Sequence, residues 1–79
     1  MKITILSLKG VEWQGEAAGL NIKTKSGEIT VLDHHRPLMT MLERGKGYVL
    51  KNDGGRVPLE ARGGFLEMSP ENELSVLVR

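Results

Sequence analysis

Signals for tight turns recur about every 8–12 residues along this chain and separate short segments rich in Ile, Val, Leu and Thr. The turns are expected at Lys9-Gly10, Ala18-Gly19, Ser26-Gly27, Gly45-Lys46-Gly47, Asn52-Asp53-Gly54-Gly55, Gly63-Gly64 and Ser69-Pro70-Glu71-Asn72. This spacing predicts an all-β protein, a flattened two-sheet β-sandwich of about nine or ten short strands. With only 79 residues, we expect positions 1–79 to form one domain with a small core.

Apolar and polar residues alternate in segments 2–8, 19–25 and 73–79, as expected of strands with one face in a core. The residues predicted to point into that core are Ile3, Ile5, Leu20, Ile22, Leu74, Val76 and Val78. Segment 37–45 starts with Pro and ends with Gly, as a helix could. We interpret it as a strand or a single turn, because it is short for a helix.

Residues 52–55 predict a hairpin, since Asn, Asp and Gly tolerate the backbone conformations of tight turns. Pro58 follows in the next strand and cannot donate a hydrogen bond to a neighbouring strand. The strand that contains Pro58 is therefore predicted to lie at a sheet edge or to carry a bulge.

The composition excludes several classes of function. Eleven basic and ten acidic residues give a net charge of +1, and Phe, Tyr and Trp occur once each, so we expect no nucleic-acid partner. There is no cysteine, and no apolar run approaches the roughly 20 residues that span a bilayer. The first ten residues lack the features of a signal peptide, and we expect a soluble intracellular domain.

Asp33, His34 and His35 raise the hypothesis of a small metal-dependent enzyme, because imidazoles and carboxylates bind zinc and iron. Adjacent side chains in an extended segment point to opposite sides, so the two histidines should not hold one ion together. The chain has no third histidine, and no serine lies in a nucleophile motif. We therefore predict no metal site, no cofactor and no catalytic residue. The glycine pairs at 54–55 and 63–64 are interpreted as a turn and a bulge.

Three large apolar residues allow both a structural and a functional interpretation. Trp13 could anchor a partner, but in a small sandwich it is more often a core filler. Met39 and Met41 lie on the strand face opposite Leu38 and Thr40, and methionine suits both adaptable interfaces and cores. Core packing is at least as good an interpretation for these two methionines.

The order of segments resembles the N-terminal β-sandwich domain of the epsilon subunit of F-type ATP synthases, called delta in mitochondria. Residues 27–39 match the family segment Gly-Glu-Phe/Met/Leu-Gly-Ile-Leu-Pro-Gly-His-Ala-Pro-Leu-Leu, and residues 62–68 match Ser-Gly-Gly-Phe-Leu-Glu-Val. A Val-rich final strand at 74–78 and the aromatic-x-Gly motif at 13–15 occur in the same order. The resemblance covers residues 2–79.

The resemblance implies a non-catalytic rotor subunit that links the gamma subunit to the polar loops of the c-ring, where it helps couple proton or sodium flow to ATP synthesis. Such a subunit is peripheral, at the cytoplasmic face of the bacterial inner membrane, and touches the membrane only through the complex. The residues implied to face the c-ring are Gly27, Glu28 and Ile29. The residues implied to face gamma are His35, Arg36, Pro37, Thr40 and Ser7.

Four positions depart from the family pattern, namely Thr30, Asp33, His34 and Arg36. They leave open an alternative function, a free-standing β-sandwich that binds a different protein. The helical hairpin with which most family members continue would follow Arg79. Since inhibition and ATP sensing reside in that hairpin, residues 1–79 are expected neither to inhibit ATP hydrolysis nor to bind ATP.

Overall fold

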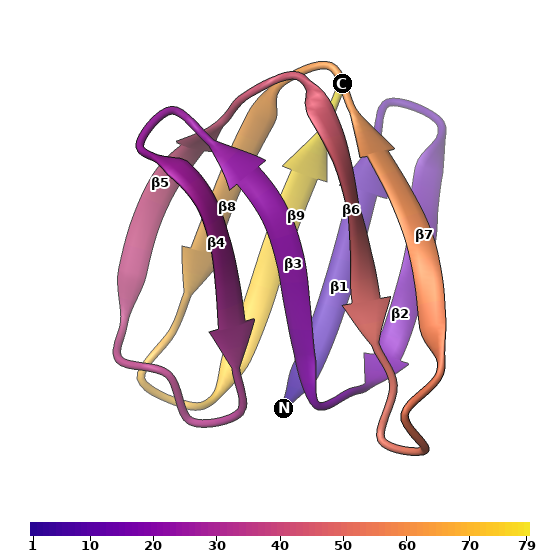
Figure 1. The fold of residues 1–79 in the computed structure, drawn as a ribbon, viewed down its shortest axis with the longest axis vertical. Helices are drawn as coiled ribbons and strands as arrows, with labels where there is room; N and C mark the ends of the chain where they lie inside the picture. Colours follow the sequence, from indigo (N-terminus) through magenta and orange to yellow (C-terminus); the bar gives the residue numbers. More distant parts are fainter.

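A computed structural model describes residues 1–79 and contains nine β-strands and no helix (Figure 1). Residues 38–42 form a strand, one of the two alternatives expected for segment 37–45. The strands are β1 (Lys2–Ser7), β2 (Gly10–Glu16), β3 (Gly19–Thr24), β4 (Gly27–Leu32), β5 (Leu38–Leu42), β6 (Gly45–Leu50), β7 (Arg56–Ala61), β8 (Gly64–Met68) and β9 (Glu73–Val78).

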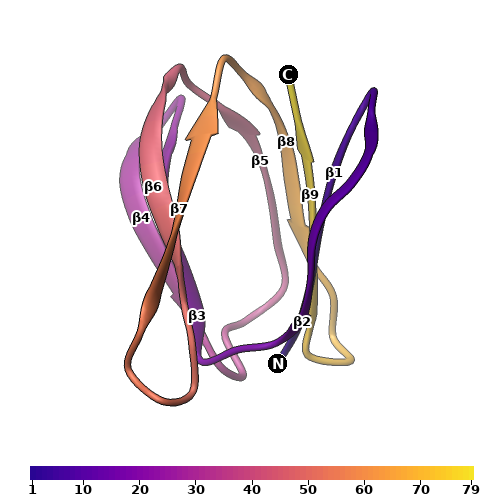
Figure 2. The same cartoon turned by 90° about the vertical axis from the view of Figure 1, so that its right-hand side faces the viewer.

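The strands form one continuous sheet that curls into two layers (Figure 2). One layer follows the order β2-β1-β9-β8-β5, and the other contains β7, β6, β3 and β4. The layers are joined where Thr24 of β3 pairs with Leu42 of β5. All pairs are antiparallel except β1 and β9, which run parallel. The predicted β-sandwich is confirmed, with nine strands.

The core lies between the two layers and consists of 15 buried hydrophobic residues. All seven residues that the alternation predicted to be internal belong to it. Trp13 is partly buried and packs against the core, as do Ile29 and Leu38. The inward-facing side chains of both layers thus hold the sandwich together.

The strand directions create two distinct ends. Odd-numbered strands run toward the top of Figure 1 and even-numbered strands run back. The upper end therefore gathers the turns β1–β2, β3–β4, β5–β6 and β7–β8 together with Arg79. The lower end gathers Met1 and the turns β2–β3, β4–β5, β6–β7 and β8–β9.

The strands β2 and β7 are the two ends of the hydrogen-bonded path and face each other across an open seam. Pro58 lies in β7, which confirms its predicted position at a sheet edge. The predicted hairpin at 52–55 forms the turn between β6 and β7. Because proline lacks an N–H, it also discourages a further strand from pairing along β7.

Candidate functional site

The residues implied to face a c-ring lie at the start of β4, at the upper end. Glu28 is exposed, and its Oε2 accepts a hydrogen bond from Asn21 Nδ2 at 2.9 Å. Asn21 is 7% exposed and also donates to Thr30 Oγ1 at 3.1 Å, so a buried amide orients the carboxylate. Ile29 packs against the core, which leaves Gly27 and Glu28 as the accessible members of this group.

The residues implied to face gamma are distributed over more than one surface. His35, Arg36 and Pro37 are exposed in the connection between β4 and β5, where His35 Nδ1 lies 2.7 Å from the carbonyl oxygen of Arg36. Thr40 is on the inward-facing side of β5. Ser7 lies at the upper end, and its hydroxyl donates to Glu12 Oε2 at 2.6 Å.

The structure therefore brings His35, Arg36 and Pro37 together and separates them from the other candidates. The length of β4 lies between Glu28 and His35, about 20 Å for six residues at 3.3 Å each. Ser7 is at the end opposite His35 (Figure 1). A single small ligand could not contact all of the candidates, whereas a large protein surface could.

The Asp33-His34-His35 segment is held by a network at the lower end. Asp33 Oδ1 accepts from the Met1 ammonium at 2.8 Å and from Asn72 Nδ2 at 2.8 Å. The backbone N–H of His34 donates to Asn72 Oδ1 at 2.7 Å. The hydrogen bond from the Met1 ammonium, and next that from Asn72, hold the pKa of Asp33 below its usual value. Asp33 thus fixes the lower end of the sandwich.

Asp33→Asn is expected to lower Tm by a few degrees at neutral pH. Because folding lowers the pKa of Asp33, the carboxylate stabilises the fold above its unfolded-state pKa, and this contribution disappears as pH falls through the folded-state pKa. Thermal melts from pH 7 downward should show the difference from wild type shrinking below the ordinary aspartate pKa of 3.8. Glu71→Gln, which removes an exposed carboxylate in the β8–β9 turn, is the control. A pH-independent Asp33→Asn difference would contradict the assignment.

No group of three His, Cys, Asp or Glu side chains is arranged to hold a metal ion. His34 Nε2 lies 3.6 Å from Asp33 Oδ2, while the ring of His35 is directed at the carbonyl oxygen of Arg36. The two imidazoles therefore make separate contacts.

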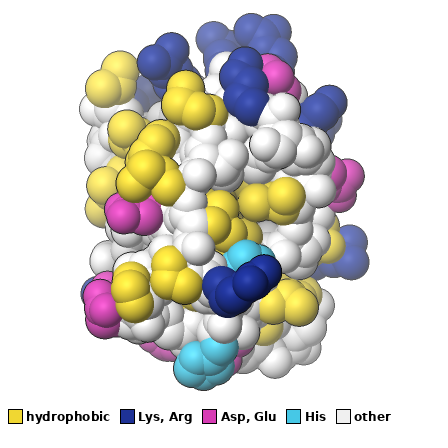
Figure 3. Space-filling model, turned by 90° about the vertical axis from the view of Figure 1, so that its left-hand side faces the viewer, with side chains coloured by type: hydrophobic (Ala, Val, Ile, Leu, Met, Phe, Trp, Pro, Cys, Tyr) yellow, Lys and Arg dark blue, Asp and Glu magenta, His cyan; other side chains and the backbone are white.

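Exposed apolar side chains form a row across the outer face of the layer that contains β1. In the strand register, Val11 is opposite Leu6, Leu6 opposite Leu77, Leu77 opposite Phe65, and Phe65 opposite Met41. These side chains are 36–60% exposed. We call these five residues the apolar row, and with neighbouring strands about 4.8 Å apart it is about 19 Å long. Figure 3 shows apolar side chains along this face, at the left of the view.

A polar row runs beside the apolar row on the same face, at the next outward-facing position of each strand toward the lower end. Its polar members in register are Gln14, Thr4, Ser75 and Glu67, and the apolar Met39 follows Glu67 on β5. A shallow hollow of about 200 Å³ lies between the rows and is lined by Thr4, Leu6, Phe65, Glu67, Ser75, Val76 and Leu77. The face thus combines an apolar stripe, hydrogen-bonding groups and a carboxylate, the usual makeup of a protein–protein contact.

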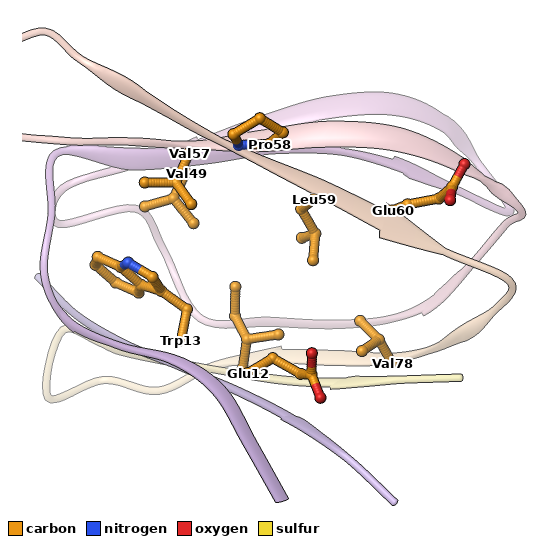
Figure 4. Close-up of a pocket in the computed structure, with 9 residues that line it drawn as sticks. Glu12, Trp13, Val49, Val57, Pro58, Leu59, Glu60 and Val78 are labelled. Atoms are coloured by element: carbon orange, nitrogen blue, oxygen red, sulfur yellow. The ribbon is translucent and has the colours of Figure 1, made fainter. Parts of the chain in front are cut away.

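A second cavity, of about 160 Å³, lies at the seam between β2 and β7 (Figure 4). The indole of Trp13 lies beside Val49 and Val57, and the carboxylates of Glu12 and Glu60 are the charged groups of its lining. The lining holds no histidine, lysine or cysteine that could serve as a partner for these carboxylates. The cavity extends the core toward the surface.

Core packing, one of the two interpretations left open for Met39 and Met41, does not hold, since these side chains are 63% and 54% exposed. The apolar row itself was not predicted. A signal existed in the alternation, because Leu77 shares its strand face with Ser75 and Glu73, and Leu6 shares its face with Thr4 and Lys2. Apolar residues on the polar face of several strands indicate a surface that another body covers.

The fold and the apolar row define a class, a β-sandwich module with an exposed apolar stripe of the kind that marks an interaction surface. A family model described as "ATP synthase, Delta/Epsilon chain, beta-sandwich domain" matches residues 1–79. The chain belongs to this family, which confirms the resemblance seen in the sequence. The structure contains no helix that could span a membrane.

Curated relatives named ATP synthase epsilon chain include that of Streptomyces coelicolor, 40% identical over 65 residues, and that of Micrococcus luteus, 34% identical over 68 residues. The matches cover 82% and 86% of this chain, and 52% and 75% of the relatives. The chain thus spans about half the length of the Streptomyces relative.

Two solved structures share the fold. A chain of the Euglena gracilis mitochondrial ATP synthase matches with a TM-score of 0.89 and 22% identity, covering 96% of this chain and 48% of that one. A chain of the central stalk and c-ring of the Tetrahymena thermophila enzyme matches with a TM-score of 0.82 and 12% identity, over 99% and 62%.

Proposed function

We propose that this chain is the β-sandwich part of a non-catalytic central-stalk subunit of a proton- or sodium-translocating F-type ATP synthase. In this role it links the gamma subunit to the c-ring and supports the coupling of ion flow to ATP synthesis. It would be peripheral, held through the complex at the cytoplasmic face of a bacterial membrane. The family match, the named relatives and the solved stalk structures support this proposal.

The apolar row is the observation that carries the proposal. Five apolar side chains in register on a hydrogen-bonded sheet would be a liability for an isolated soluble protein, because such surfaces associate. Coverage by gamma would remove them from water and stabilise the small fold by mass action. A sheet is also stiff, and transmission of torque between two bodies requires stiffness.

The proposed gamma-facing surface is the apolar row with the residues at its margins. Ser7 follows Leu6, whereas Thr40, between Met39 and Met41 in the sequence, faces inward and underlies this surface. His35, Arg36 and Pro37 precede β5 and border the same layer at its lower corner. Gly27 and Glu28, with Ile29 behind them, are proposed to face the c-ring from the upper end, where the oriented carboxylate would set register more than affinity.

Co-expression with gamma and c subunits of the same organism tests the assignment. The 79-residue chain is expected to co-purify with gamma, and with the ring only when gamma is present. Recovery of the chain free of both subunits, while a different protein is retained on it, would favour the alternative of a free-standing binding module.

Glu28→Lys is expected to weaken coupling while leaving the sandwich folded. The substitution places two lysines opposite each other, because Glu28 pairs with Lys23 across the strands, at a cost of about 0.2–1 kcal/mol. In inverted membranes that carry the whole complex, ATP-driven ion pumping should fall severalfold relative to ATP hydrolysis.

Glu73→Lys is the matched control, since Glu73 is also an exposed strand residue opposite a lysine, Lys2, but lies at the lower end. It should retain coupling and lose no more stability than Glu28→Lys, which also removes the hydrogen bond from Asn21. Unfolding of the isolated Glu28→Lys chain would instead assign Glu28 a structural role.

A further inference from the structure

Every chain segment at the upper end carries a basic residue. The four turns there each contribute one, and a fifth follows β9; they are Lys9, Lys25, Arg44, Arg62 and Arg79. We call these five residues the basic end. The same segments contain one acidic residue, Glu43. At the lower end the turns carry three acidic residues and two basic ones, namely Asp33, Asp53, Glu71, Arg36 and Lys51. The net charge of +1 conceals this asymmetry, and Figure 3 shows Lys and Arg gathered at the top.

Backbone contacts place these cations on adjacent segments. The N–H of Arg62 donates to the carbonyl of Arg79 at 3.0 Å, and the N–H of Arg79 donates to that of Gly63 at 3.0 Å. Arg44 and Arg62 flank the pair formed by Gly45 and Ala61. The arginines thus lie on neighbouring strand ends and form one continuous surface.

Most of this positive charge has no partner within the chain. Lys25 Nζ lies 3.2 Å from Glu43 Oε1, but no carboxylate lies within ion-pair distance of Lys9, Arg44, Arg62 or Arg79. Glu12 and Glu60 line a hollow with Lys9 and Arg79 and moderate the charge on that side. On the side with Arg44 and Arg62, Glu43 is paired with Lys25, and neither guanidinium has an ion-pair partner. A group of like charges creates a positive potential that attracts an anionic surface.

An exposed leucine accompanies the cations. Leu8, at the tip of the β1–β2 hairpin, has its whole side chain in solvent, with a relative exposure of 102%. It precedes Lys9, and both residues line the hollow that contains Arg79. Amphipathic helices that lie in the headgroup region of a membrane combine the same two kinds of side chain, basic and apolar.

We propose that the basic end binds anionic phospholipid headgroups, with Leu8 inserted between them. The cations are spread across the end on separate turns, which suits a flat array of phosphates better than one concave ligand. Each Lys or Arg near an anionic membrane strengthens binding about fivefold, so the interaction is weak and sensitive to salt. The basic end adjoins the apolar row, since Lys9 lies two residues from Val11 and Arg79 two residues from Leu77, but its cations lie in the turns and not on the strand faces. The proposed ring-facing Glu28 is at the same end, which would then face the membrane.

Sedimentation of the 79-residue chain with phospholipid vesicles tests this inference. The chain should sediment with vesicles of equal parts phosphatidylcholine and phosphatidylglycerol at low salt, and not with phosphatidylcholine alone. Binding should disappear near 1 M salt, where the Debye length is about 3 Å. Arg44→Gln/Arg62→Gln should weaken binding about 25-fold, and Leu8→Ser should weaken it severalfold.

The matched control is Arg36→Gln/Lys51→Gln, which removes the same charge from the lower end and should retain most of the binding. Circular dichroism would show that all variants are folded. Absence of binding to the phosphatidylglycerol vesicles would overturn the proposal, as would equal losses in both double variants. End-specific binding to polyglutamate without vesicle binding would overturn it too, in favour of an acidic protein partner. None of these outcomes bears on gamma binding, which the co-purification experiment measures separately.

Discussion

Gly64→Ala is expected to unfold the sandwich or leave it with a small fraction of its stability. Gly64 has φ of +134°, a conformation that costs a residue with a side chain about 1–3 kcal/mol. A Cβ at this position would also overlap the carbonyl oxygen of Leu77 on the paired strand β9. Relief of that overlap requires β8 and β9 to separate locally, and a domain of this size has only about 4–12 kcal/mol of stability in total.

Gly10→Ala separates the cost of the backbone conformation from the cost of the overlap. Gly10 has a similar φ of +117°, but no atom lies within 4 Å of an added Cβ. It should lose only the conformational cost of about 1–3 kcal/mol. Urea unfolding followed by Trp13 fluorescence measures both variants. Equal losses of unfolding free energy in the two variants would mean that β8 and β9 adjust to the added methyl group at no further cost. The argument from strand contact would then be wrong.

The sequence predicted those features of the fold that depend on short segments. Alternation placed Ile3, Ile5 and their equivalents in the core, and the turn at 52–55 and the edge position of Pro58 followed from the chemistry of single residues. Each of these depends on the geometry of one strand or one turn. They can therefore be inferred without knowing which strands are neighbours.

The candidate surfaces depend on strand pairing and could not be inferred in the same way. Alternation divides β5 into two faces but does not say that Met39 and Met41 face solvent, since a sandwich could cover either side. The apolar row exists because β1 pairs in parallel with β9, and because β9 and β5 flank β8. These contacts join residues from both ends of the chain.

The charge asymmetry and the Asp33 network have the same origin. The composition alone argued against a basic surface, yet the alternating strand directions collect one cation from each turn at the upper end. Likewise, Asp33 meets Asn72 only because the β4–β5 and β8–β9 connections lie at the same end. The family resemblance supplied candidate residues, but it could not supply these neighbours.

Leu77→Glu is expected to weaken binding to gamma strongly without unfolding the sandwich. Leu77 is the central member of the apolar row and is 51% exposed, so a glutamate there can remain hydrated in the free chain. In a covered interface the same carboxylate would be buried without a partner. An uncompensated buried charge costs about 3–5 kcal/mol, so affinity should fall by a factor of about 100 or more.

Leu32→Glu is the matched control, because Leu32 is 52% exposed and lies in a strand of the other layer. Both variants should show similar urea midpoints, and only Leu77→Glu should lose heat of binding in calorimetric titrations with gamma. Equal effects of the two substitutions would assign the loss to a general cost of added charge. Loss with Leu32→Glu alone would move the gamma contact to the layer of β4, and the apolar row would then need a different partner.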